Sequence, residues 1–220
     1  MELLDTLRTT ILVGFRALPL LLISFIAFLA IGLGNMGMFI LLLGHTLVVP
    51  ITTAILQFIT GKMYIAGDNR AFVSGSDVVQ LVPSLSSTLP VNVMPSYWMQ
   101  HVLFFFGYLL ANGVGLLRLP QEKGQSDVNY ENRVAKAKAV ITVAVLAALG
   151  FAAFRYRTGA ETWRGVALSF AAGGGLGFAW YQFAAYCGAR HADVFGVAPS
   201  MVPVSAKDEK AMTCIYAPKP

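Results

Sequence analysis

The chain has 220 residues, of which 56% are hydrophobic and only 12% are charged, and its mean hydropathy is +0.66. Soluble domains carry about 25% charged residues, so this composition excludes an ordinary water-soluble domain. The net charge of +5 comes from basic residues beside apolar segments, such as Arg155, Arg157 and Arg164. This placement favours contact with anionic lipid head groups, and nucleic acid is not expected as a partner.

The first segment, residues 1–16, predicts a short amphipathic helix, because apolar residues recur there at spacings of three and four. They are Leu3, Leu4, Leu7, Ile11 and Phe15. Beyond it lie four long stretches without Asp, Glu, Lys or Arg, at 17–61, 78–117, 139–154 and 165–189. Because about 20 apolar residues cross a bilayer, these stretches predict an all-α, multi-pass transmembrane helix bundle of about five helices.

The uncharged run 17–61 is long enough for two crossings. We expect helices at about 17–33 and 36–60, joined by a turn where Gly32, Gly34, Asn35 and Gly37 cluster. Pro50 lies inside the second of these helices and predicts a kink, because proline lacks the amide hydrogen that a helix interior needs.

The remainder predicts a polar extramembrane loop at 61–96 and three further helices at about 97–117, 137–154 and 164–187. Tyr97 and Trp98 are expected in an aromatic belt at the membrane surface. Residues 118–136 form a charged connector. Residues 1–187 are thus a transmembrane helical domain, and residues 188–220 an extended, proline-containing C-terminal tail. Basic residues divide evenly between the two sides, so the orientation in the membrane stays open.

The predicted spans contain no Asp, Glu, Lys or Arg, and His45 and His101 are the only ionisable candidates in or beside them. Ionisable groups inside a membrane usually mark ion paths or haem ligands. Two histidines on separate helices are interpreted as hydrogen-bonding groups within the bundle. We therefore predict no catalytic, cofactor-binding or metal-binding residues and no cofactor, and we do not expect an enzyme.

A glycine-rich run, Gly173 to Gly177, lacks the Lys-Ser/Thr that a phosphate-binding loop requires. Small residues four apart instead predict close packing between helices. One row is Gly173 and Gly177, and helix 97–117 carries another. A third row consists of Ala171, Gly175 and Ala179. We expect these rows to pack within the chain rather than against a partner subunit. The row on helix 97–117 consists of Gly107, Ala111 and Gly115.

Two further features leave alternatives open. Cys187 and Cys214 can pair with each other or remain free thiols. Phe104, Phe105 and Phe106 surround their helix, so part of this aromatic cluster must face lipid. Packing against lipid and within the bundle is favoured over the alternative, an aromatic cofactor pocket.

The segment from Leu89 to Asn112 carries a Pro-Ser-Tyr-Trp sequence followed by an aromatic helix that ends in Ala-Asn. It resembles multi-pass membrane proteins of nucleocytoplasmic large DNA viruses, including those of algae and amoebae. The resemblance implies a structural virion protein in the internal membrane beneath the capsid. It also implies contacts with minor capsid or other membrane proteins through 61–96 and 188–220.

Two alternatives remain. One is a non-catalytic accessory subunit of a respiratory or photosynthetic membrane complex, because small multi-span subunits there also lack catalytic residues. The other is a small transporter or channel, although such proteins usually carry charged residues along the path of the solute.

Overall fold

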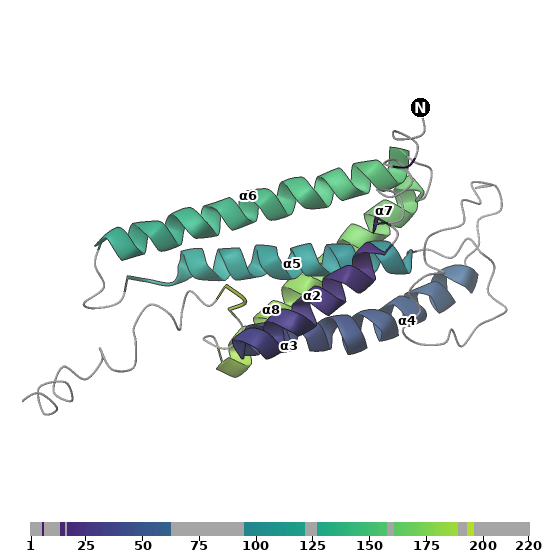
Figure 1. Ribbon diagram of the computed structural model, residues 1–220. Coiled ribbons are helices and arrows are strands. Elements are labelled where there is room, and N and C mark those ends of the chain that lie inside the picture. Colours follow the sequence, from purple (N-terminus) through teal and green to yellow (C-terminus); the bar gives the residue numbers. More distant parts are fainter. Residues whose placement is uncertain are drawn as a thin grey trace, which may run out of the picture.

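The computed structural model describes residues 6, 14–15, 17–62, 95–121, 127–157, 161–188 and 193–195. They form five helical rods, so the all-α prediction with five helices is confirmed (Figure 1). Three rods are uninterrupted: α2 (Leu18–Leu33), α5 (Tyr97–Arg118) and α6 (Asp127–Arg157). Each of the other two contains a π-helical turn: α3 (Met36–Leu43), π-turn Gly44–Val48 and α4 (Val49–Lys62); and α7 (Trp163–Ser169), π-turn Phe170–Gly174 and α8 (Gly175–Gly188).

The expected turn after the first rod has a local cause. Gly34 ends α2 at φ 60°, the left-handed region that glycine adopts without steric cost. Asn35 then starts α3, because its Oδ1 accepts the N–H groups of Gly37 at 2.8 Å and of Met38 at 3.3 Å. The two helices therefore reverse direction within a two-residue connection.

The expected disturbance at Pro50 takes the form of a widened turn. The proline ring conflicts with the carbonyl four residues earlier, on Thr46, and the π-turn Gly44–Val48 contains that carbonyl. At its end the Val49 N–H donates to the Gly44 carbonyl, one residue further back than in an α-helix. The helix thus continues through the proline, and His45 lies in the widened turn.

Helix α6 begins at Asp127, earlier than the predicted 137–154, so the charged connector is shorter than expected. Its extra turns carry charged residues, and hydropathy therefore did not mark them as helix. Arg133 lies in this extension and is buried. Its Nη2 donates to the carbonyl of Leu119 at 2.6 Å and of Pro120 at 3.2 Å, which fixes the end of α5 beside α6.

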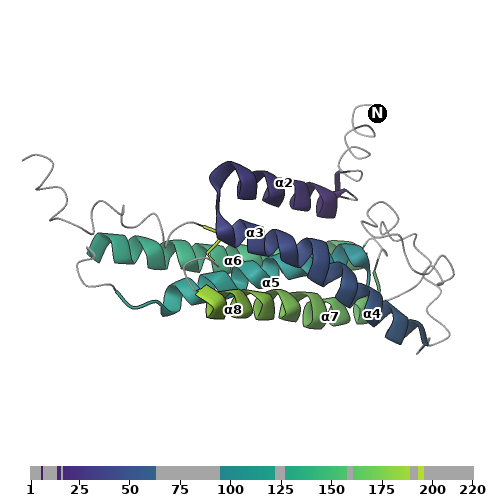
Figure 2. The ribbon, with the colours of Figure 1, turned by 90° about the horizontal axis from the view of Figure 1, so that it is seen from below.

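Helix α5 is the centre of the bundle and packs against α4, α6, α7 and α8 (Figure 1). Its buried side chains include Trp98, Phe104 and Tyr108. Helix α2 lies on the outer side of α3 and has its main contacts with it (Figure 2).

Successive rods along the chain run in alternating directions. The rod α3–α4 is antiparallel to α5, because His45 contacts His101 and, further along, Gln57 contacts Pro95. Helix α6 is also antiparallel to α5, whereas α7–α8 runs parallel to it, since Gln100 meets Gly173 and Phe104 meets Gly177. We call the two ends the Trp98 end, which holds Phe15, 95–98, 155–157 and 161–163, and the Asn112 end, which holds 34–35, 112–118 and 188.

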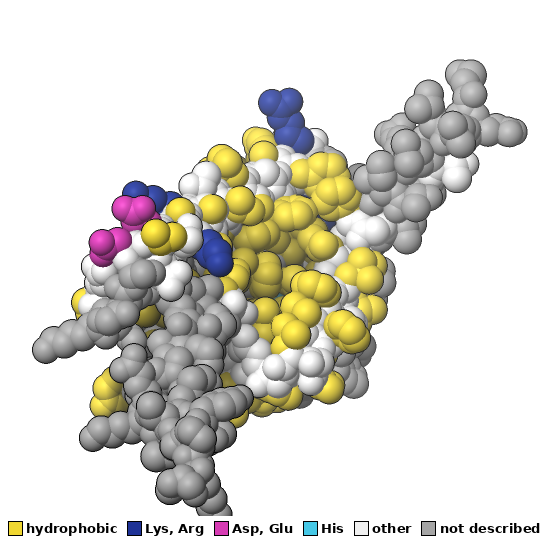
Figure 3. All heavy atoms as spheres, turned by 60° about the vertical axis from the view of Figure 1, so that its left-hand side comes forward, with side chains coloured by type: hydrophobic (Ala, Val, Ile, Leu, Met, Phe, Trp, Pro, Cys, Tyr) yellow, Lys and Arg dark blue, Asp and Glu magenta, His cyan; other side chains and the backbone are white. Residues whose placement is uncertain are grey.

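The outer surface is rich in apolar side chains, as expected for contact with lipid. Three helices in the described part of the chain are long and apolar enough to cross a membrane: Met36–Thr60, Tyr97–Arg118 and Asp127–Arg157. Helix α2 is apolar but shorter. Exposed residues such as Phe28, Ile31 and Leu146 face outward. Figure 3 shows a face on which apolar side chains predominate and which is hollowed in the middle. The chain is therefore a multi-pass helical membrane protein.

Several sequence predictions concern residues that lie largely outside the described ones. These are the amphipathic helix 1–16, most of the loop 61–96 and most of the tail 188–220. They stay predictions.

Candidate functional site

The two histidines that the sequence singled out meet inside the bundle. His45 lies in the π-turn of the second rod and His101 lies near the start of α5, and both side chains are fully buried. Their Nδ1 atoms are 3.0 Å apart. The preceding Gly44 lies close to two aromatic side chains, because a Cβ there would lie 2.8 Å from Cε1 of Phe104 and from Nε1 of Trp180.

The imidazoles point at each other rather than lying face to face. The ring planes differ by only 9° and the ring centres are 5.3 Å apart. The distance between the ring centres equals the Nδ1–Nδ1 distance plus the distance from Nδ1 to the ring centre in each imidazole. The two ring centres and the two Nδ1 atoms therefore lie nearly on one line. A straight N–H···N hydrogen bond results, in which one Nδ1 donates and the other accepts.

This geometry suits a hydrogen bond better than a metal ion. An ion held between two facing nitrogens needs about 2.0–2.1 Å to each, and hence about 4 Å between them. Tyr97 lies beside the pair, with its ring centre 4.4 Å from that of His101. The interpretation of His45 and His101 as hydrogen-bonding groups within the bundle is confirmed.

The glycines that were expected to allow close helix approach do so where α5 meets the last rod. A Cβ on Gly107 would overlap the carbonyl oxygen of Gly174, and one on Gly177 would overlap that of Phe104. A Cβ on Gly173 would lie 3.0 Å from the Gln100 carbonyl oxygen. Because the obstacles are backbone atoms, only glycine fits at Gly107 and Gly177. Packing within the chain is confirmed for these residues.

The other row of small residues behaves differently. Ala171, Gly175 and Ala179 are exposed, and a Cβ on Gly175 would meet nothing within 4 Å. The expectation that this row packs within the chain is wrong. Gly173 and Gly177 lie on the opposite face of the same helix, and that face packs against α5.

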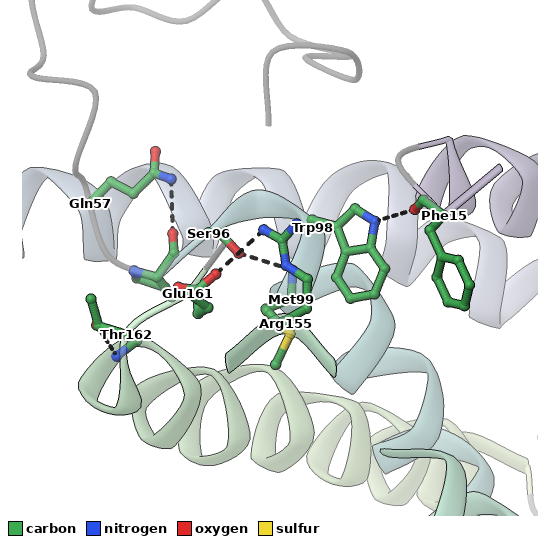
Figure 4. A network of polar contacts seen from close by, with 10 residues as sticks. Phe15, Gln57, Ser96, Trp98, Met99, Arg155, Glu161 and Thr162 are labelled. Atoms are coloured by element: carbon green, nitrogen blue, oxygen red, sulfur yellow. Dashed lines mark hydrogen bonds and ion pairs between the residues drawn. The ribbon is translucent and has the colours of Figure 1, made fainter. Parts of the chain in front are cut away.

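A second polar cluster, which the sequence did not predict, closes the Trp98 end (Figure 4). Ser96 caps α5 by accepting the Met99 N–H at 3.2 Å, and the indole N–H of Trp98 donates to the Phe15 carbonyl at 2.8 Å. The side-chain amide of Gln57 donates to the Pro95 carbonyl at 2.9 Å. These bonds join the start of α5 to α4 and to the residues before α2.

Arg155 and Glu161 form a buried ion pair in the same cluster, with Nη2 and Oε2 3.6 Å apart. The guanidinium also lies 4.9 Å from the centre of the Trp98 ring, a cation–π contact. The expectations that Arg155 meets lipid head groups and that Trp98 belongs to an aromatic belt are both wrong, because these side chains are 6% and 2% exposed. By contrast Arg157, Arg164 and Trp163 are exposed.

The carboxyl group of Glu161 lies where three parts of the chain converge. It accepts hydrogen bonds from the hydroxyl and the backbone N–H of Ser96 and pairs with Arg155. A Cβ on Gly165 would overlap its Oε1, so the carboxyl group lies directly over the first turn of α7. Burial nevertheless outweighs these favourable contacts and raises the pKa of Glu161 above its ordinary value.

The raised pKa predicts how stability depends on pH. The folded protein holds a proton on Glu161 more strongly than the unfolded chain does, so this group stabilises the fold at low pH. That contribution is lost as pH rises through the folded pKa. We expect Glu161→Gln to remove this component from unfolding curves measured from about pH 4, near the ordinary pKa of glutamate, upward. The matched substitution at an exposed position, Glu131→Gln, is the control, and an unchanged slope in Glu161→Gln would contradict the assignment.

The cysteines do not meet in the described part of the chain. Cys187 is exposed on α8 and forms no disulfide with a described residue, and Cys214 lies outside the described residues. Whether the two pair stays open.

No protein-family model matches the chain, and neither a curated protein nor a solved structure is similar to it at a significant level.

Proposed function

We propose that this chain is a non-enzymatic structural membrane protein that presents two extramembrane segments on opposite faces of a bilayer. The helix directions support the proposal. The loop after α4 and before α5 has both of its attachment points, Lys62 and Tyr97, at the Trp98 end. The tail leaves α8 at Gly188, at the Asn112 end.

The resemblance to virion membrane proteins supports a more specific version. The described part of the resembling segment, residues 95–112, is the central helix with its cap. We infer that the chain resides in the internal membrane of a large DNA virus and ties this membrane to the capsid. Because the loop and the tail leave from opposite ends, only one of them can reach the capsid. The other must face the interior of the particle.

A membrane anchor has to hold its helices together when a partner pulls on one segment. The Trp98-end cluster joins α4, α5, α6 and α7 by side-chain contacts, among them Gln57–Pro95 and Arg155–Glu161. Further from the Trp98 end, the His45–His101 bond joins α5 to the second rod, and the glycine contact joins α5 to α8. A force on either segment is thereby shared by the whole bundle.

Photo-crosslinking in purified virions tests this function. A photoreactive residue replaces Phe195 at the Asn112 end in one variant and Trp163 at the Trp98 end in another. We expect crosslinks to a capsid protein from one of the two variants only. Absence of the chain from virions, or its purification with a pigment- or haem-bearing complex, would contradict virion anchoring. Capsid crosslinks from both ends would contradict the opposite placement of the segments.

A further inference from the structure

A short piece of the C-terminal segment, Asp193–Phe195, lies against the Asn112 end of the bundle. Asn112 is fully buried and contacts this piece through both atoms of its amide. Its Nδ2 donates to Oδ1 of Asp193 at 3.3 Å, and its Oδ1 accepts the Val194 N–H at 3.1 Å. The Asn112 side chain therefore forms hydrogen bonds with one side-chain acceptor and one backbone donor of the same segment.

A second asparagine also binds the backbone of this piece. Asn35, which caps α3, donates from Nδ2 to the Val194 carbonyl at 3.3 Å. The neighbouring Gly37 lets the backbone approach closely, because a Cβ there would lie 2.7 Å from the Asp193 carbonyl oxygen. Oδ1 of Asp193 also accepts the Phe195 N–H at 3.0 Å, which turns the chain at this point.

Two residues of this piece are buried although they lie outside the described helices. Asp193 and Val194 are each only 3% exposed, and Val194 belongs to the main apolar core with Leu41 and Tyr181. A buried carboxyl group is costly without partners, so its hydrogen bonds are needed for the segment to stay in place. Side-chain recognition and core packing together fix these three residues.

We propose that Asn35, Asn112 and Asp193–Phe195 form a tail clasp, a binding site through which the bundle holds the root of its own C-terminal tail. The clasp attaches the tail to α3 and to the central helix α5, and not to α8 alone. A partner that pulls on residues beyond Phe195 then acts on the centre of the bundle. This use of the clasp rests on the proposed function, whereas the binding itself does not.

The test measures hydrogen exchange of the Val194 and Phe195 amides in the full-length protein in lipid nanodiscs. We expect slow exchange in the wild type and an acceleration of roughly tenfold or more in Asn112→Ala, which removes two of the contacts. Asn112→Asp should have the same effect, because it sets two carboxyl groups against each other. Combining Asn112→Asp with Asp193→Asn restores one donor facing one acceptor, and slow exchange should return.

The matched control is Gln182→Ala, which removes an exposed amide on α8 and should leave both amides protected. The double variant Asn112→Asp, Asp193→Asn also separates loss of the contact from misfolding, since a second substitution would not restore slow exchange in a misfolded bundle. Fast exchange in the wild type, or in this double variant, would overturn the clasp. Failure of virion anchoring with normal protection of Val194 would overturn only the proposed function.

Discussion

Replacing Gly177 with alanine is expected to lower the free energy of unfolding by about 2–3 kcal/mol, because the new methyl group has no space. Its Cβ would overlap the Phe104 carbonyl oxygen and lie 2.9 Å from the Tyr108 nitrogen. Both obstacles belong to the backbone of α5, so relief requires the two helices to separate. Equilibrium unfolding in mixed detergent micelles would measure the change.

The chain provides its own control two residues away. Gly175 is exposed, with nothing within 4 Å of the position that a Cβ would take. Gly175→Ala removes the flexibility of glycine without a clash, so it should be neutral or stabilising by up to about 1 kcal/mol. Equal effects of the two substitutions would show that α5 and α8 do not approach as described.

The second large effect concerns the histidine pair. His101→Leu removes one partner of the buried bond and leaves Nδ1 of His45 without its contact, at a cost of about 1–3 kcal/mol. His45→Leu should cost a similar amount for the same reason. The double variant removes both imidazoles, so no buried Nδ1 remains without its partner. Its loss of stability should therefore be clearly smaller than the sum of the two single losses.

The same unfolding measurement on the wild type, both single variants and the double variant gives the coupling energy. A contact of this kind should yield about 0.5–3 kcal/mol. Strictly additive losses would mean that the two imidazoles stabilise the bundle independently, which would contradict a direct Nδ1–Nδ1 bond.

Features set by neighbouring residues in the chain were predictable from the sequence. Gly34 and Asn35 produce the α2–α3 turn by their own backbone and capping preferences, whatever surrounds them. The spacing of Gly173 and Gly177 indicates one narrow helix face. In each case the cause lies within one or two turns of helix.

Features set by tertiary neighbours were not predictable. Trp98 and Arg155 have the composition of a membrane surface, and only the fold brings them together and buries them. Nothing in the sequence near Asp193 marks it as a partner of Asn112. The start of α6 was missed because hydropathy detects the lipid-facing part of a helix, and this helix continues into charged turns.

The central claim, that the bundle crosses a membrane with its ends on opposite faces, can be tested by single-cysteine labelling. In a variant with Cys187 and Cys214 replaced by serine, one new cysteine replaces either Asn129 or Arg157, the exposed residues near the two ends of α6. An impermeant maleimide is then added to sealed vesicles before or after permeabilisation. We expect one position to react at once and the other only after permeabilisation. Reaction of both positions from the same side would contradict the account.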